Sequence, residues 1–308
     1  MMLYLITLTL GMIFLLSGMK LMRYGLQSFA GSAFAKFIDR MTATPWRSMG
    51  SGVIASAILQ SSTALTVMTV SLVDAGLLPF ENSLGLILGS NIGTTVTTQL
   101  MALPLGKFSI YILCLGAMGF LFFSSHRRYL ALAISGLGLI FLSLTLLKSG
   151  MAPLTEYPAL QTFLHQLGSH HLRGILAGAF MAALMHSSGA TTGIAMILVN
   201  NGWITFPTAL AFVFGANIGT CITALIASLA ANSAAQRVAL FHVLLNFFGV
   251  LLFYPFLNPL AHLLPWLGGS LAQQTANAHT LFNLVSSLLA FPLLPLAARL
   301  LRHWGKSP

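Results

Sequence analysis

The chain has 308 residues, of which 57% are hydrophobic and only 6% are charged. A soluble domain carries about 25% charged residues, and several apolar runs here reach the roughly 20 residues that a helix needs to cross a bilayer. The composition therefore excludes a soluble protein and makes the lipid bilayer an expected partner. The net charge of +10 does not indicate nucleic acid, because the basic residues sit in short loops between apolar runs, as in cytoplasmic loops of membrane proteins.

The first membrane span is predicted at residues 2–22. Basic residues cluster at its end and in the segment that follows, at Lys20, Arg23, Lys36, Arg40 and Arg47. This cluster predicts that residues 23–49 lie in the cytoplasm and that the N-terminus lies outside. No basic residue precedes the apolar run, so we expect an uncleaved span and no signal peptide.

Residues 50–74 are apolar at both ends and polar in the middle, at Gln60-Ser61-Ser62. Each apolar arm has about ten residues and is too short to cross ~30 Å of hydrocarbon as a helix. Polar backbone at that depth needs protein or a water-filled cavity around it. The pattern therefore predicts a re-entrant helical hairpin.

The same reasoning predicts the remaining segments. A second re-entrant hairpin is expected at 172–199, and full spans at 84–103, 108–123, 129–147, 208–229, 238–257 and 279–298. With both hairpins re-entrant, Arg127, Arg128, Arg237 and the basic tail fall in the cytoplasm, as the positive-inside rule requires. The charge-free loop 258–278 then falls outside, and residues 149–172 are expected to form a solvated outer loop.

A pair of polar motifs occurs twice at an offset of 126 residues. Gln60-Ser61-Ser62 and Gly89-Ser90-Asn91-Ile92-Gly93-Thr94 correspond to His186-Ser187-Ser188 and Gly215-Ala216-Asn217-Ile218-Gly219-Thr220. An ungapped comparison of residues 52–97 with 178–223 gives 17 identities in 46 positions. We interpret this pattern as a duplicated unit.

Each copy has three predicted crossings beside its hairpin, and this odd number inverts the second copy relative to the first. Inverted repeats with broken helices are an architecture of many secondary transporters. We therefore expect an all-α integral membrane protein with two inverted-topology repeats, each with a re-entrant helical hairpin and a broken or unwound helix, plus one extra C-terminal span. The expected divisions are 1–127 for the first repeat, 128–258 for the second, and 259–308 for the C-terminal span and cytoplasmic tail.

The middle of each motif is neutral and rich in hydroxyl groups. Hydroxyl and N–H donors at half-helix N-termini suit an oxyanion, whereas hydroxyl, amide and carbonyl oxygens suit Na⁺. A dianion with no Lys or Arg beside it is costly at low dielectric, and co-bound Na⁺ would supply positive charge. All the acidic residues lie near segment ends or in loops, which argues against a carboxylate proton relay; they are Asp39, Asp74, Glu81 and Glu156.

The duplicated set gives the candidate site. The expected oxyanion-binding residues are Gln60, Ser61, Ser62, Thr63, His186, Ser187 and Ser188. The residues expected to bind Na⁺ or to support the hairpins are Thr66, Asn91, Thr94, Thr95, Thr191, Thr192, Asn217 and Thr220. Close helix packing explains any single Ser or Thr equally simply, but the repetition at equal spacing favours a site.

Two further polar pairs have helical i, i+4 spacing, His242 with Asn246 and His279 with Asn283. They either line the site or, as we favour, form interhelical hydrogen bonds. We find no nucleophile with a positioned base, no metal-ligand spacing and no cofactor loop. The sequence therefore predicts no enzyme, no cofactor, and no metal ion other than Na⁺.

The motifs are similar to those of the type II sodium/phosphate cotransporter family, in its bacterial branch. The stretches 242–246 and 277–283 also resemble this family, and the resemblance covers roughly residues 5–300. It implies Na⁺-driven transport of inorganic phosphate across the bacterial inner membrane, with the two Gln-Ser-Ser regions binding phosphate and Na⁺. Many bacterial relatives carry a C-terminal regulatory domain, which we do not expect here. A second copy of the chain is a further candidate partner.

The sequence departs from the family pattern at three places. His186 stands where the motif has Gln, Gly189 stands where Ser or Thr is common, and no His-x-x-Phe-Asn element is visible around 109–116. The Na⁺-to-phosphate ratio is therefore left open. The expected mechanism is alternating access, by rocking of the two repeats about a central site. The alternatives are a carrier of another small oxyanion on the same fold, and a channel or a non-transporting membrane protein.

Overall fold

The chain is helical throughout the part that the structure describes. The computed structural model describes the backbone of residues 2–41 and 44–303, and their side chains except 32–41 and 155. Within these ranges there are α-helices and short 3₁₀ helices and no strand. Five segments of the described chain are long and apolar enough to cross a membrane, and α4 (Phe80–Met101) with α5 (Ser109–Phe122) forms a bent sixth. The protein is therefore a multi-pass helical membrane protein.

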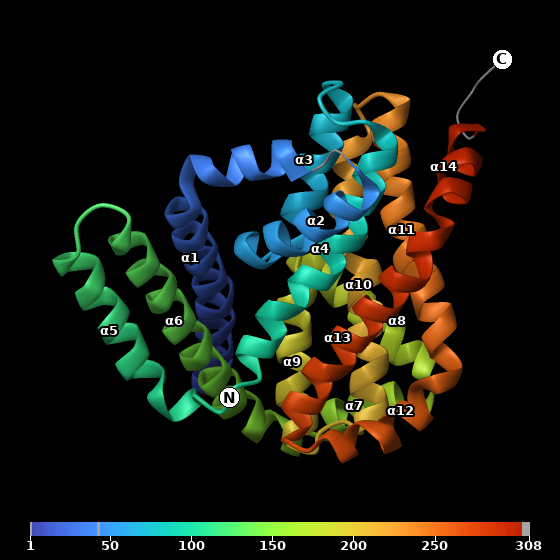
Figure 1. Ribbon diagram of the computed structural model, residues 1–308. Coiled ribbons are helices and arrows are strands. Elements are labelled where there is room, and N and C mark those ends of the chain that lie inside the picture. The colour runs from blue at the N-terminus through green and yellow to red at the C-terminus, as the bar shows by residue number, and fades with distance from the viewer. Residues whose placement is uncertain (1, 42–43, 304–308) are drawn as a thin grey trace.

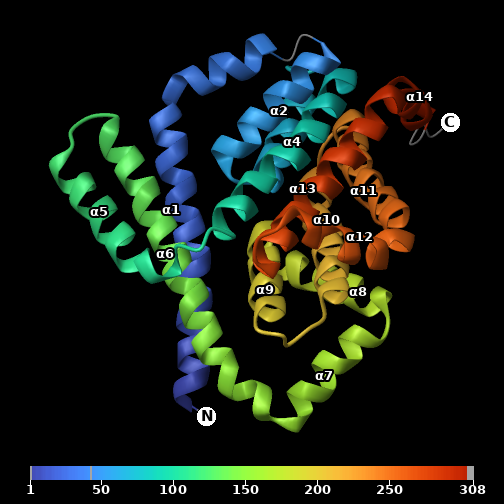
Figure 2. The same cartoon turned by 60° about the horizontal axis from the view of Figure 1, so that its bottom comes forward.

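Three helices, α1 (Met2–Met41), α5 and α6 (Arg127–Met151), lie together at one side of the molecule (Figures 1 and 2). Both α1 and α5 pack against α6. Gly25 of α1 lies against the backbone of α6, and Gly136 of α6 lies against the backbone of α1, so neither position has room for a side chain. Small residues of this kind let membrane helices approach closely. We call these helices the α1–α5–α6 group.

The other long helices form a larger bundle around α4 and α10 (Phe206–Ser228). Helix α2 (Pro45–Leu59) packs along α4, and α8 (His171–Met185) packs along α10. A Cβ added at Gly89 or at Gly215 would collide with a backbone carbonyl of the facing helix. The motif glycines therefore allow backbone contact between helices.

This packing decides between two roles that the motif glycines allow, an unwound segment or a close approach of two helices. Helices α4 and α10 run without interruption through the Asn-Ile-Gly-Thr motifs at 91–94 and 217–220, so the chain does not unwind there. The carbonyl oxygens of the facing helices leave no room for a Cβ, so the glycines serve the close contact. The chain breaks instead at Gln60 and His186, between α2 and α3 and between α8 and α9.

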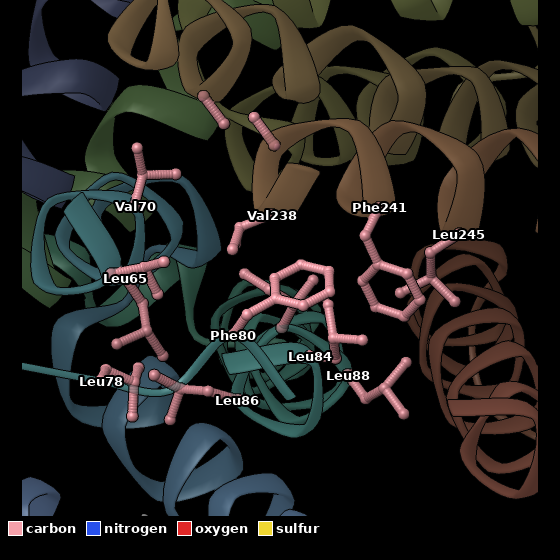
Figure 3. Packing of buried hydrophobic residues seen from close by; sticks show 14 of the residues in the cluster. Leu65, Val70, Leu78, Phe80, Leu84, Leu86, Leu88, Val238, Phe241 and Leu245 are labelled. Carbon is pink, nitrogen blue, oxygen red and sulfur yellow. The ribbon is translucent and has the colours of Figure 1, made fainter. Parts of the chain in front are cut away.

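The helices after these breaks, α3 (Ser62–Asp74) and α9 (Ser188–Asn200), lie inside the bundle. Helix α3 packs on α4, α10 and α11 (Ser233–Phe253), whereas α9 packs on α4, α10 and α13 (Leu271–Ala290). Figure 3 shows the apolar cluster in which side chains of α3, α4 and α11 meet. Its labelled members are Leu65, Val70, Leu78, Phe80, Leu84, Leu86, Leu88, Val238, Phe241 and Leu245.

Several segments between the spans differ from the predictions. Helix α1 does not end near residue 22 but continues to Met41, changing direction at Gly31, whose φ is +54°. The predicted outer loop 149–172 contains α7 (Pro158–Ser169), which packs on α8. Hydropathy marks only segments of spanning length, so short helices between spans were read as loops. The remaining short helices are η1 (Gly106–Phe108), η2 (Ala152–Glu156), η3 (Tyr254–Phe256), α12 (Leu257–Leu263), η4 (Leu264–Leu267), η5 (Phe291–Leu293) and α14 (Leu294–His303).

Helix α5 is also shorter than predicted. Its 14 residues extend for about 21 Å, which is less than the ~30 Å of the hydrocarbon layer. The segments α4 and 106–122 pass as a span only together, with a bend of 74° between them. The predicted full crossing at 108–123 therefore stays a prediction.

Three helix boundaries recur at the offset of the sequence repeat. The ends of α2 and α8 and the starts of α3 and α9 and of α4 and α10 all differ by 126 residues, at Leu59 and Met185, Ser62 and Ser188, and Phe80 and Phe206. The two copies are not separate bodies, because α1 packs on α6 and α3 packs on α10. The predicted limits of the repeats at 127 and 258 stay predictions.

Candidate functional site

Each hairpin tip has the same backbone conformation. Gln60 and His186 adopt left-handed conformations with φ of 51° and 50°, which side-chain-bearing residues adopt at a cost of about 1–3 kcal/mol. The next residues, Ser61 and Ser187, are extended and cap α3 and α9. The hydroxyl of each serine accepts a hydrogen bond from the backbone N–H three residues later, over 3.1 Å in both tips. A serine hydroxyl that accepts in this way can still donate its proton.

The two tips face each other across a small cavity. It is lined by both tips together with residues of α4 and α1: Met19, Gln60, Ser61, Ser62, Thr63, Thr94, Thr97, His186, Ser187, Ser188 and Gly189. The cavity thus brings together all seven residues predicted to bind the oxyanion. It leaves about 10 Å³ for the centre of a water-sized sphere, which is room for about one water. A larger ion needs the tips to move apart.

The helix N-termini give the cavity its electrostatic character. Helices α3 and α9 both begin at the tips, so their unpaired N–H groups and positive dipole ends lie at the cavity. Among the described residues that line it, none is Lys, Arg, Asp or Glu. No group of three His, Cys, Asp or Glu side chains with metal-binding geometry occurs in the described part of the chain. The chemistry available is therefore hydrogen-bond donation from hydroxyl, imidazole and backbone groups to an anion.

Each tip is held by a threonine 37 residues further along the chain. Thr97 Oγ1 donates to Gln60 Oε1 over 2.6 Å, and His186 Nδ1 lies 2.7 Å from Thr223 Oγ1. Sequence analysis missed both threonines, although their identity at an offset of 126 was a usable signal. The two tips differ in exposure, because Gln60 is only 4% exposed whereas His186 is exposed.

The motif asparagines lie in helix-to-helix hydrogen bonds. Asn91 Oδ1 lies 3.2 Å from His242 Nε2, and Asn91 Nδ2 donates to Asn246 Oδ1 over 3.0 Å. On the other side, Asn217 Oδ1 lies 3.2 Å from His279 Nε2. The interhelical alternative for both histidines is therefore confirmed, and neither histidine lines the cavity.

Of the threonines predicted to bind Na⁺ or to support the hairpins, Thr94 lines the cavity and the others fall into two classes. The hydroxyls of Thr95, Thr191 and Thr220 bond to carbonyls of their own helices. The hydroxyls of Thr66 and Thr192 are fully buried and have no hydrogen-bond partner. These two positions are equivalent in the sequence repeat, since they differ by 126. A buried polar atom without a partner costs about 1–3 kcal/mol and calls for an explanation.

The sequence model of the Na⁺/Pi-cotransporter family matches residues 14–149 and 150–262. YqeW of Bacillus subtilis is 35% identical over 83% of this chain and 84% of its own length. YjbB of Salmonella typhimurium, a protein named for inorganic phosphate export, is 31% identical over 80% of this chain. The match covers 46% of YjbB, so this chain spans about half of that relative's length.

A part of the chain is also similar to a human protein. The sodium-dependent phosphate transport protein 2B of Homo sapiens is 40% identical over 26% of this chain and 12% of its own length. No solved structure matches the chain. The relatives whose names state a function are transport proteins and not enzymes. Since the family model covers most of the sequence and YqeW matches over most of both chains, this chain belongs to the Na⁺/Pi-cotransporter family.

Proposed function

We propose that the protein is a secondary transporter that couples Na⁺ movement to the transport of inorganic phosphate by alternating access. The observation that carries this proposal is the meeting of two capped helix N-termini, from two copies of one motif, across a cavity without charged side chains. Helix N-termini bind oxyanions through backbone N–H groups and the helix dipole. Names of relatives, which mention phosphate transport, support the choice of phosphate.

The phosphate lies, in this proposal, between the two tips. Ser62 and Ser188 are the first residues of α3 and α9, so they offer both a hydroxyl and an unpaired N–H group. The remaining ligands are Gln60, Ser61, Thr63, His186 and Ser187. Since the cavity has room for about one water, phosphate entry requires separation of the tips, and the present structure is a contracted state.

Sodium binds, in this proposal, beside the unpartnered hydroxyls of Thr66 and Thr192. Both are fully buried, and hydroxyl oxygens are suitable ligands for a hard cation. A positive ion near each helix N-terminus would also offset the charge of a dianion that has no Lys or Arg at its cavity. The other residues of the predicted set support the helices that carry these hydroxyls. They are Asn91, Asn217, Thr94, Thr95, Thr191 and Thr220.

The recurrence of helix boundaries at 126 residues supports two repeats, and we propose that they are inverted and that both hairpins are re-entrant. The basic loops support our proposal that the C-terminus lies in the cytoplasm and the N-terminus outside a bacterial inner membrane. A reporter that is active only in the cytoplasm tests this topology when it is fused after residue 308; an inactive fusion that is present at normal levels would contradict it.

The packing suggests which parts move. Rocking of residues 1–127 against 128–258 would separate α1 from α6 and α3 from α10, which pack together. A division between the α1–α5–α6 group and the bundle that carries both tips leaves those contacts intact. We therefore propose that the bundle moves relative to this group, in place of the predicted rocking of repeats.

The test is uptake of radiolabelled phosphate into proteoliposomes, with an inward Na⁺ gradient compared with an equal K⁺ gradient. We expect saturable, Na⁺-dependent accumulation, and its loss in the double variant Ser62→Ala with Ser188→Ala. Ser71→Ala is the matched control, because Ser71 lies on the same helix as Ser62 but is exposed and bonded to its own helix. Normal uptake by the folded double variant would remove the site, and uptake equal under both gradients would remove the coupling. Inhibition of phosphate uptake by other oxyanions tests the alternative that the transported substrate is an oxyanion other than phosphate.

A further inference from the structure

We propose that Arg23 of α1 contacts the transported anion and supplies a positive charge that the hairpin tips lack. The proposal rests on the phosphate-binding cavity proposed above and extends it to a residue outside both repeated motifs. Arg23 lies inside the apolar span Met2–Gly31, where an ionisable residue calls for a partner or a function.

The Nε–H group of Arg23 has no partner among the residues whose side chains the structure describes. The side chain is partly buried, and its Nε atom is inaccessible to solvent and without a hydrogen-bond partner. No ion pair joins Arg23 to any residue whose side chain the structure describes. Other arginines are engaged, because Arg302 pairs with Glu81 and Arg173 donates to Ser169 over 2.8 Å.

The acidic side chains that the structure describes do not serve Arg23. Asp74 accepts from the backbone N–H of Asn232 over 2.7 Å, and Glu81 accepts from Arg302. Glu156 is exposed, beyond the end of α6. Arg23 lies eight residues before the end of the span at Gly31, so its burial costs less than the ~2.5–3.5 kcal/mol of an arginine at the centre of a membrane helix, and an anion that binds it would offset part of that cost.

The geometry of α1 directs Arg23 toward the cavity. Met19, four residues earlier, lines the cavity between the tips, and its Cε lies 3.6 Å from the position of a Cβ at Gly189. Residues at i and i+4 share a helix face and lie about 6 Å apart along the axis. Helix side chains lean toward the helix N-terminus, so the Arg23 side chain lies over the turn of Met19 and thus toward the tips.

The chemistry of the two residues fits a gated anion contact. A guanidinium binds phosphate through two parallel N–H···O bonds, while methionine is flexible and adapts to irregular gaps. In the present contracted state, Met19 lines the cavity and Arg23 does not. When the tips move apart and Met19 changes rotamer, the space that the Met19 side chain leaves lets the Arg23 guanidinium contact the bound anion. Arg23 belongs to the α1–α5–α6 group, whereas the anion moves with the bundle. Arg23 therefore contacts the anion in only one of the positions that the bundle adopts.

The experiment compares Arg23→Gln, Arg23→Lys and Lys20→Gln in the full chain, in proteoliposomes. Lys20→Gln is the matched control, since it removes the same charge from the same helix at an exposed position. We expect Arg23→Gln to raise the KM for phosphate at least tenfold, Arg23→Lys to raise it less, and Lys20→Gln to change it less than twofold. The Na⁺ concentration for half-maximal uptake should change little, because Arg23 holds the anion.

A second measurement does not depend on turnover. In a Cys114→Ser background, phosphate with Na⁺ should slow the alkylation of Cys introduced by Arg23→Cys, and Na⁺ alone should not. Unchanged phosphate KM in Arg23→Gln, or alkylation that phosphate does not slow, overturns the role of Arg23 while leaving the proposed function intact. A wild-type protein that neither accumulates phosphate nor shows this protection overturns the proposed function, and the role of Arg23 with it.

Discussion

Thr66 and Thr192 are the residues at which a bound ion has the most direct signature. Both hydroxyls are buried without a partner, at equivalent positions of the two copies. Thr95 offers a contrast, because its hydroxyl bonds to the Ile92 carbonyl over 2.7 Å. An unpartnered hydroxyl destabilises the ion-free protein, whereas an ion ligand stabilises the ion-bound protein, so the two roles separate when stability is measured with and without Na⁺.

Replacing these threonines by valine tests the Na⁺ sites. Thr66→Val and Thr192→Val should leave the thermal stability in K⁺ equal or raise it, since removing a buried, unpartnered hydroxyl removes a cost of about 1–3 kcal/mol. Each variant should lose part of the Tm increase that Na⁺ gives the wild type by mass action. Thr95→Val serves as the control and should keep the full Na⁺ increase. A full Na⁺ increase in both variants would contradict the ion sites.

At the residue scale, the repeated motifs predicted the members of the tips well. All seven residues expected to bind the anion line one cavity, because the same short motif fixes the same left-handed turn twice. Residues outside the motifs were harder to predict. Thr97 could have been found from its repetition at Thr223, whereas Met19 reaches the cavity only through the packing of α1, and packing between distant helices has no local sequence pattern. The motif asparagines were expected to bind Na⁺ or to support the hairpins, and in the structure both lie within hydrogen-bond distance of histidines of α11 and α13.

At the scale of helices, close packing explains the glycines of the motifs at 89–94 and 215–220. Along α2 and α4, and along α8 and α10, glycines place two helix backbones in contact, as Gly89 and Gly215 do. From the sequence, the glycines favoured unwinding and close packing equally. Hydropathy located the long spans, and α10 and α11 begin and end within a few residues of their predictions. It could not locate α7 or α12, since amphipathic helices of 12 or 7 residues do not stand out in a window of spanning length.

Alanine substitutions test this account of helix packing. Gly89→Ala and Gly215→Ala should each destabilise the protein by about 1–3 kcal/mol or more, because the added methyl group meets a carbonyl of the facing helix. Gly50→Ala on α2 is the control, since nothing lies within 4 Å of its added Cβ, and it should stabilise the helix by up to about 1 kcal/mol. Thermal unfolding in detergent measures all three, and equal Tm values for Gly89→Ala and Gly50→Ala would contradict the close contact.

At the scale of the whole molecule, transport requires one group of helices to move against another. The α1–α5–α6 group lies beside the bundle (Figure 1), and Met19 contributes to the cavity from the group side. Both hairpin tips belong to the bundle, so movement at this boundary would change access to the cavity without breaking either tip. Movement between the two halves of the sequence would instead separate α1 from α6, whose backbones are in contact at Gly25 and Gly136.

Two cross-links distinguish these movements. In a Cys114→Ser background, Met19→Cys with Gly189→Cys places one thiol on α1 and one on the second tip, where Met19 Cε lies 3.6 Å from the position of a Cβ at Gly189. Tyr24→Cys with Tyr129→Cys joins α1 to α6, at rings whose centroids are 6.3 Å apart. If the bundle moves against the α1–α5–α6 group, a short thiol cross-linker should arrest phosphate uptake in the first pair and spare it in the second, with recovery in the first when the cross-link is reduced. Arrest in both pairs would instead show that the two halves of the sequence move against each other, because that movement separates α1 from α6 as well as from the second tip.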